Sequence, residues 1–121
     1  MIILLNKNSH IHLIGIGGVS MSGIAEILAE RGYRVSGSDL NESKYLDLLR
    51  KYEIDVFIGH TAANIEGADL IVKTSAIPED NPEILAAKKK GLKIVKRAEM
   101  LSYLMRKKKT IAVAGTHGKT T

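Results

Sequence analysis

Residues 11–23 read Ile11-His12-Leu13-Ile14-Gly15-Ile16-Gly17-Gly18-Val19-Ser20-Met21-Ser22-Gly23. A short apolar run leads into Gly-x-Gly-Gly, and apolar residues at helical spacing follow. This order predicts a strand, a tight glycine turn and a helix N-terminus. Glycine lets the backbone approach a phosphate closely, and the N–H groups and dipole of the helix attract negative charge. The stretch therefore predicts a site for a phosphate-bearing ligand, with a nucleotide as the expected class.

The glycine pattern by itself is weak, because Ser20 stands where the third glycine of G-x-G-x-x-G would be. Serine is small enough to keep close helix–strand packing, and its hydroxyl could cap the helix or meet a phosphate oxygen. Asp39 follows Gly17 by 22 residues, about where such folds place the acid that holds ribose hydroxyls. The alternatives are a plain strand-to-helix turn without a ligand, and a capping or turn role for Asp39.

The length and composition of the chain exclude several classes of protein. The chain has 121 residues, which is one-domain size, and no cysteine for disulfides, thiolate metal sites or a cysteine nucleophile. No apolar stretch reaches the roughly 18 residues of a membrane span, and residues 1–9 resemble an arm or edge strand rather than a secretory signal. We therefore expect a cytoplasmic protein without a membrane partner.

The net charge of +5 is unevenly distributed. Residues 86–121 hold eleven Lys and Arg against one acidic residue, whereas residues 1–85 hold seven against twelve. The runs Lys88–Lys90 and Arg106–Lys109 fall where helices are expected to end, and cations there complement the helix dipole. Aromatic residues that could stack on bases are not interleaved among them. We interpret both runs as solvated helix ends and expect no nucleic-acid partner.

Strand and helix patterns alternate along the chain. We predict strands at residues 11–14, 33–37, 54–58, 70–74 and 92–95 and a last one at 111–114. Gly32 is expected to end the first helix, Asn41 or Ser43 to start the second, and Asn81-Pro82 the third. This alternation predicts an α/β fold: a Rossmann-like, doubly wound parallel sheet of about five strands with helices on both faces.

Ligands in such sheets bind over the carboxyl ends of the strands, where four predicted features converge. These are Gly15–Ser20, Asp39, His60 and Ser75. His60 could donate to a phosphate or be a surface-loop histidine, and Ser75 could contact ligand or only form the turn before Ile77-Pro78. His10 and His12 flank the first strand without metal-ligand spacing, so we predict structural roles for them.

The C-terminus carries a second phosphate motif. Residues 114–121 read Ala-Gly-Thr-His-Gly-Lys-Thr-Thr after a predicted strand, which is a shortened form of the phosphate-binding loop of nucleoside triphosphatases. In such loops backbone N–H groups cradle the phosphates, the lysine neutralises their charge and a hydroxyl ligates Mg²⁺. The predicted ATP contacts are Gly115, Thr116, His117, Gly118, Lys119, Thr120 and Thr121.

The two motifs together resemble the Mur ligase family of peptidoglycan synthesis. The resemblance runs from His10 onward and is carried by His12–Gly18 with Met21-Ser22, Ser36–Asp39, Ser75–Pro78, Arg97–Leu101 and Ala114–Thr121. Ser20 departs from it, because the family usually has glycine there. The resemblance implies residues 10–108 as a UDP-sugar-binding domain and residues 109–121 as the start of a central ATPase domain.

The resemblance also implies an ATP-dependent ligase that joins L-alanine to the lactyl carboxylate of UDP-N-acetylmuramate through an acyl phosphate. ATP and Mg²⁺ would be needed, with Lys119 on the phosphates and Thr120 toward the metal. The 121 residues alone would bind the UDP-sugar and be inactive. The implied sugar-nucleotide contacts are Gly15, Gly17, Gly18, Ser20, Met21, Ser22, Asp39, His60 and Ser75.

Alternative functions use the first motif differently. A nicotinamide-dependent oxidoreductase or a nucleotide-sensing module would explain Gly15–Ser20 and Asp39, but not Gly115–Thr121. A ligase that recycles UDP-muramyl tripeptide would share the architecture. Binding of UDP-sugar rather than NAD(H) would separate the ligases from the other two.

Overall fold

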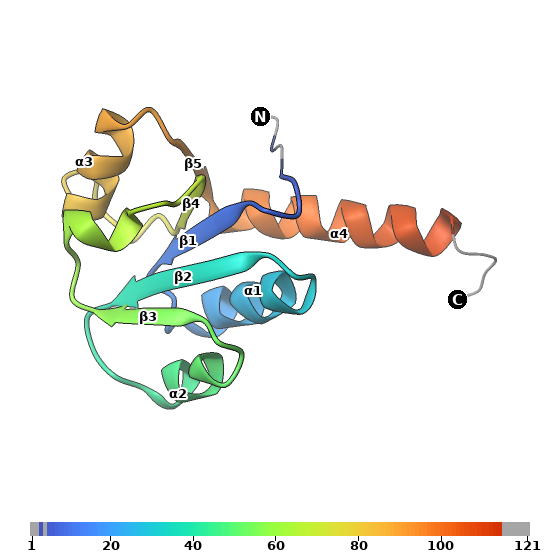
Figure 1. Cartoon of the computed structure of the whole chain (residues 1–121), viewed down its shortest axis with the longest axis horizontal. Helices are drawn as coiled ribbons and strands as arrows, with labels where there is room; N and C mark the ends of the chain where they lie inside the picture. The colour runs from blue at the N-terminus through green and yellow to red at the C-terminus, as the bar shows by residue number, and fades with distance from the viewer. Residues whose placement is uncertain (1–2, 4, 115–121) are drawn as a thin grey trace.

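The computed structural model describes residue 3 and residues 5–114, with side chains as far as residue 106. Five parallel strands form one sheet in the order β3-β2-β1-β4-β5 (Figure 1). In chain order the elements are β1 (His10–Ile14), α1 (Val19–Glu30), β2 (Arg34–Asp39), α2 (Lys44–Arg50), β3 (Asp55–Ile58), the 3₁₀-helix η1 (Ala62–Ile65), β4 (Leu70–Lys73), α3 (Pro82–Lys89), β5 (Lys93–Lys96) and α4 (Arg97–Ala114). The predicted α/β class and doubly wound parallel sheet are confirmed.

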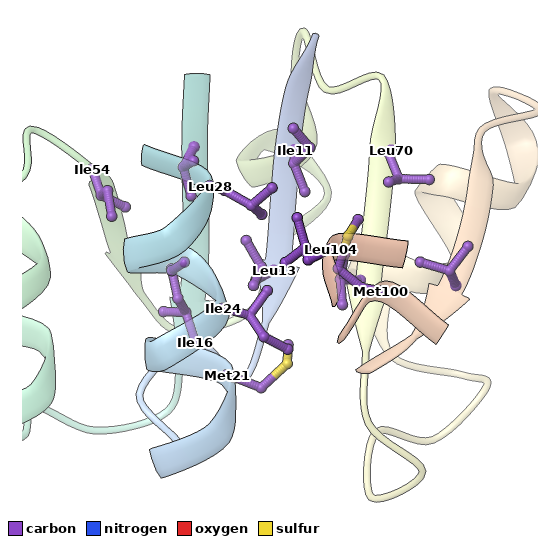
Figure 2. Close-up of a cluster of buried hydrophobic side chains, with 14 of the residues drawn as sticks. Ile11, Leu13, Ile16, Met21, Ile24, Leu28, Ile54, Leu70, Met100 and Leu104 are labelled. Carbon is purple, nitrogen blue, oxygen red and sulfur yellow. The ribbon is translucent and has the colours of Figure 1, made fainter. Parts of the chain in front are cut away.

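Two apolar clusters hold helices on opposite faces of the sheet. On one face Ile11 and Leu13 of β1 pack with α1, α2 and α4, as Figure 2 shows for Met21, Ile24 and Leu104. On the other face a smaller cluster joins β1 and β4 to η1 and α3, and consists of Ile14, Ile65, Ala68, Ile71, Ile84 and Ala87. Every residue of β1 is buried, as expected for a central parallel strand.

The strand order places the glycine turn at the topological switch point. From β1 the chain moves through α1 to β2 on one side, while β4 lies on the other side of β1. The connections therefore diverge beyond the carboxyl ends of β1 and β4, which is where ligands bind in open α/β sheets.

The predicted last strand over residues 111–114 is wrong, because these residues continue α4, which runs from Arg97 to Ala114. A short Ile-Ala-Val-Ala run forms a strand only where it pairs with another strand. In the described part of the chain β3 and β5 remain the edge strands of the sheet, so residues 111–114 pair with neither. The alanines also favour continuation of an existing helix. The run Arg106–Lys109 consequently lies within α4, not at a helix end.

The other helix and strand boundaries lie within one or two residues of those predicted from the sequence. Asn81 caps α3, its Oδ1 accepting from the N–H of Glu83 at 2.8 Å. Lys88, Lys89 and Lys90 are exposed at the end of α3, as predicted. Ile3 is buried in the larger apolar cluster and is not part of a strand. Within the described residues, no helix has the length and apolar character needed to cross a membrane.

Candidate ligand site at the carboxyl edge of the sheet

The glycine turn is anchored to the neighbouring strand β2. Gly15 has a φ of +85°, a left-handed conformation that favours glycine. The N–H groups of Gly15 and Ile16 both donate to the carbonyl of Ser38, at 2.8 and 3.0 Å. This turn redirects the chain from the end of β1 into α1, so the helix N-terminus faces the carboxyl edge of the sheet.

The first turn of α1 has backbone N–H groups that lack a hydrogen-bond acceptor. Gly18 is the N-cap and supplies no side-chain acceptor, and the first intrahelical bond runs from the N–H of Ser22 to the carbonyl of Gly18, at 2.8 Å. Within the described residues, the N–H groups of Val19, Ser20 and Met21 have no hydrogen-bond acceptor. These open N–H groups and the helix dipole can accept an anion.

The side chains of this turn differ in what they can offer a ligand. Ser20 is exposed. Ser22 is buried, and its hydroxyl donates to the carbonyl of Val19 at 2.9 Å, so its side-chain and backbone donors are both used inside the helix. The side chain of Met21 is buried in the apolar cluster, which leaves its N–H group as the part that a ligand could reach.

The side chain of Asp39 is hydrogen-bonded to the glycine turn. One carboxylate oxygen, Oδ2, accepts from the N–H of Gly17 at 2.8 Å, and the other accepts from Leu40 at 2.8 Å. A Cβ on Gly17 would lie 2.7 Å from that Oδ2, which explains why glycine is needed there. The carboxylate is half-buried and retains acceptor capacity beyond these two bonds.

His60 and Ser75 lie at the same edge in different settings. His60 follows β3, and its Nδ1 lies 2.9 Å from the hydroxyl of Ser38. Ser75 is exposed in the turn after β4. The same turn carries Ile77, whose Cδ1 would lie 3.7 Å from a Cβ on Gly15, so the two turns are neighbours.

Sequence reasoning missed a buried polar cluster behind this edge. Glu83 of α3 is completely buried, and its Oε1 lies 2.6 Å from Nε2 of His12. Through Ser36 the contacts continue to His10, whose Nε2 lies 2.7 Å from the shared hydroxyl. Both histidines are buried and hydrogen-bonded inside the fold, which agrees with the structural roles predicted for them. In the sequence Glu83 resembles an ordinary first-turn acid, so its role could not be predicted.

Burial and hydrogen bonding shift the pKa of Glu83 in opposite directions. Burial alone would raise the pKa of Glu83, but hydrogen bonds from His12, Asn64 and Ser38 and the charge of His12 outweigh it and lower the pKa. Burial lowers the pKa of His10. Glu83 is therefore ionised and His10 uncharged at neutral pH.

One further feature does not involve the glycine turn. A hollow of about 490 Å³ lies along α4, lined by Arg97, Ala98, Leu101, Ser102, Met105 and Arg106. It contains none of the predicted ligand residues. The predicted ATP contacts, residues 115–121, lie outside the described part of the chain.

Comparison with known proteins places this geometry in a family. Residues 10–109 match the model of the Mur ligase family, catalytic domain. The chain is 54% identical over 116 residues to UDP-N-acetylmuramate–L-alanine ligase of Nitratidesulfovibrio vulgaris, covering 96% of this chain and 26% of that protein. The chain thus spans about a quarter of the length of the curated relatives that it matches.

Solved structures give the same assignment. The UDP-N-acetylmuramate–alanine ligase of Thermotoga maritima has a TM-score of 0.78 at 36% identity, over 81% of this chain and 23% of that one. A murein peptide ligase of Psychrobacter arcticus has a TM-score of 0.75 at 26% identity, over 79% and 20%. Similarity to a putative epimerase/dehydratase of Bacillus halodurans and to a shikimate dehydrogenase of Aquifex aeolicus, at 15% and 20% identity, shows a shared fold alone. The chain belongs to the Mur ligase family.

Proposed function

We propose that this chain is the UDP-sugar-binding domain of a ligase that joins L-alanine to UDP-N-acetylmuramate. The proposal rests on two features at the same edge of the sheet. These are the backbone N–H groups of Val19–Met21, which have no acceptor among the described residues, and the carboxylate of Asp39. The N–H groups suit a pyrophosphate, and the carboxylate suits hydroxyl or N–H donors of a uridine. The names of relatives at 54% identity support alanine as the amino acid.

The contacts in this proposal divide by chemistry. Gly15, Gly17, Gly18 and the first-turn N–H groups would bind the pyrophosphate, and Asp39 the uridine. Ser20 could add its exposed hydroxyl. Ser22 would act by holding the helix turn, because its donors are already used. Ser75 would contact the ligand from the turn beside Gly15.

The remaining chemistry belongs to the whole ligase. In the proposed reaction the lactyl carboxylate takes the γ-phosphoryl group of ATP to form an acyl phosphate. The amine of L-alanine then displaces phosphate and forms the amide. Residues 115–121 would bind ATP, with Lys119 neutralising phosphate charge and Thr120 toward Mg²⁺. We expect the reaction in the cytoplasm, and no catalysis by these 121 residues alone.

A calorimetric titration of the chain with UDP-N-acetylmuramate, and separately with NADH, tests the proposal. Saturable binding of the UDP-sugar without binding of NADH is the expected result. Binding of NADH alone would instead support the oxidoreductase or sensing alternative. The tripeptide-recycling ligase is less well supported. Two solved ligases of that kind are 26% and 33% identical to this chain, whereas the solved alanine ligase is 36% identical and a curated alanine ligase 54% identical.

A further inference from the structure

The buried carboxylate of Glu83 is bonded on both of its oxygens. Oε1 lies 2.6 Å from Nε2 of His12 and 2.8 Å from the hydroxyl of Ser38. Oε2 lies 2.9 Å from Nδ2 of Asn64 and 3.1 Å from Nδ1 of His60. The partners come from β1, β2, the loop after β3 and η1, so one side chain of α3 joins four separate segments.

These contacts decide where protons reside. An ionised carboxylate only accepts hydrogen bonds, so each of its four partners must donate. Ser38 has a single hydroxyl proton, which it gives to Glu83, and its oxygen can then only accept from His60. Both neighbours of Nδ1 of His60 are therefore acceptors. When the imidazole carries one proton, that proton must be on Nδ1.

The other ring nitrogen of His60 is left for a ligand. The side chain of His60 is 11% exposed, whereas that of His12 is completely buried. Within the described residues, Nε2 of His60 has no hydrogen-bond partner. The residue lies beside Asp39, because the N–H of Gly59 donates to the carbonyl of Asp39 at 2.7 Å.

We propose that Glu83 is a positioning residue that fixes the Nδ1–H tautomer of His60, so that Nε2 accepts a hydrogen bond from the nucleoside end of the ligand. The identity of that ligand rests on the proposed function. A neutral ring held this way offers a lone pair, which suits an O–H or N–H group and not a phosphate oxygen. The edge then has donors at Val19–Met21 for phosphates and acceptors at Asp39 and His60 for the nucleoside.

The tautomer can be measured directly without a ligand. Long-range ¹H–¹⁵N correlation spectra of the labelled 121-residue chain distinguish protonated from unprotonated ring nitrogens of its four histidines. His60→Gln identifies the His60 signals by their loss. At a pH where the ring carries one proton, we expect protonated Nδ1 and unprotonated Nε2. The opposite tautomer would overturn the proposal.

Substitution of the carboxylate tests the cause. Glu83→Leu removes both acceptor oxygens and frees the hydroxyl of Ser38 to donate to Nδ1, so His60 should move toward the Nε2–H tautomer. Glu66→Leu is the matched control, since the Glu66 side chain is 78% exposed and its hydrogen bonds and ion pair go to Lys90; it should leave the tautomer unchanged. An unchanged His60 tautomer in folded Glu83→Leu would contradict the role of Glu83. If that variant does not fold, the spectrum of the unsubstituted chain still decides the tautomer.

Three probes locate the ligand group. Uridine and UDP should shift the Nε2 resonance of His60, whereas inorganic pyrophosphate should shift Val19–Met21 amides and leave Nε2 unchanged. A shift of Nε2 with pyrophosphate would overturn the assignment of the nucleoside to His60. Failure of UDP to bind would overturn the ligand assignment together with the proposed function, while the tautomer is decided by the unliganded spectrum.

Discussion

At the scale of single residues, the site depends on how closely Asp39 approaches Gly17. The contact leaves no room for a side chain on the turn, since a Cβ there would lie 2.7 Å from the carboxylate and 3.3 Å from Cδ2 of Leu46. The spacing of Gly17 and Asp39 was visible in the sequence. Their direct hydrogen bond was not, because sequence spacing does not say which side chain turns back onto the backbone.

Gly17→Ala should displace the carboxylate of Asp39 and weaken UDP binding at least about tenfold, or about 1.4 kcal/mol. Gly23→Ala is the matched control, because a Cβ at Gly23 in α1 meets nothing within 4 Å. That control should stabilise the fold by roughly 0.5–1 kcal/mol through helix propensity and keep UDP affinity. Calorimetry and thermal unfolding measure both effects. Equal UDP affinity in the two variants would argue against a ligand at this turn.

Asp39→Ala should weaken UDP binding by roughly 1.5–3 kcal/mol, the usual cost of losing a charged hydrogen-bond partner. Asp47→Ala is a suitable control, because the Asp47 side chain is 75% exposed on α2, where it pairs with Arg50. Isothermal titration with UDP compares the two. Unchanged affinity in Asp39→Ala would remove this residue from the site.

At the scale of elements, the helix starts show how sequence reasoning succeeds and fails. Asn81-Pro82 was predicted to start α3, and the Asn81 cap is confirmed. Ser43 was one of two predicted caps for α2 and does occupy the N-cap, but its hydroxyl is buried without a hydrogen-bond partner among the described residues. A residue type predicts the position of a cap, while the geometry of the preceding loop decides whether the bond forms.

These two caps should respond differently to alanine. Asn81→Ala should cost about 1 kcal/mol of unfolding free energy, because the N–H of Glu83 loses its acceptor. Ser43→Ala removes an unsatisfied buried hydroxyl and should be neutral or stabilising. Urea denaturation of both variants measures the difference. Equal losses would contradict the assigned roles of the two side chains.

The sheet was predictable and its last element was not. Five strands followed from apolar runs closed by glycine or polar turns, and the prediction placed them to within one or two residues. Residues 111–114 were misassigned because a four-residue apolar run fits a strand or a helix equally well. Glu83 was missed for another reason: its partners come from segments that only the fold brings together.

At the scale of the whole molecule, stability should fall on acidification in two steps. The folded pKa of His10 lies below its ordinary value of 6.5, so the unfolded chain takes up a proton first and stability declines as pH falls below about 6.5. Glu83 has a pKa lowered from 4.5, so its contribution is present above that pH and is lost as pH falls further. The pKa of Glu79 is lowered to about 2 by Lys88 and Lys73, so its ionised form also stabilises the folded chain and that contribution is lost as the pH falls.

Urea denaturation at a series of pH values tests this account, with His10→Gln as the variant that removes the first step. The amide of glutamine can still bond to Ser36 but does not titrate. Stability that is constant between pH 7 and 5 in the unsubstituted chain would contradict a buried neutral His10.

The proposed function requires that the carboxyl edge of this sheet bind a uridine diphosphate. Backbone amide ¹H–¹⁵N spectra of the chain, recorded during titration with UDP, would show which residues the nucleotide contacts. We expect saturable shifts at Gly15–Met21, Asp39–Leu40, Gly59–His60 and Ser75–Ile77. Shifts confined to the hollow along Arg97–Arg106 of α4, or no shifts at millimolar UDP, would contradict the proposed function.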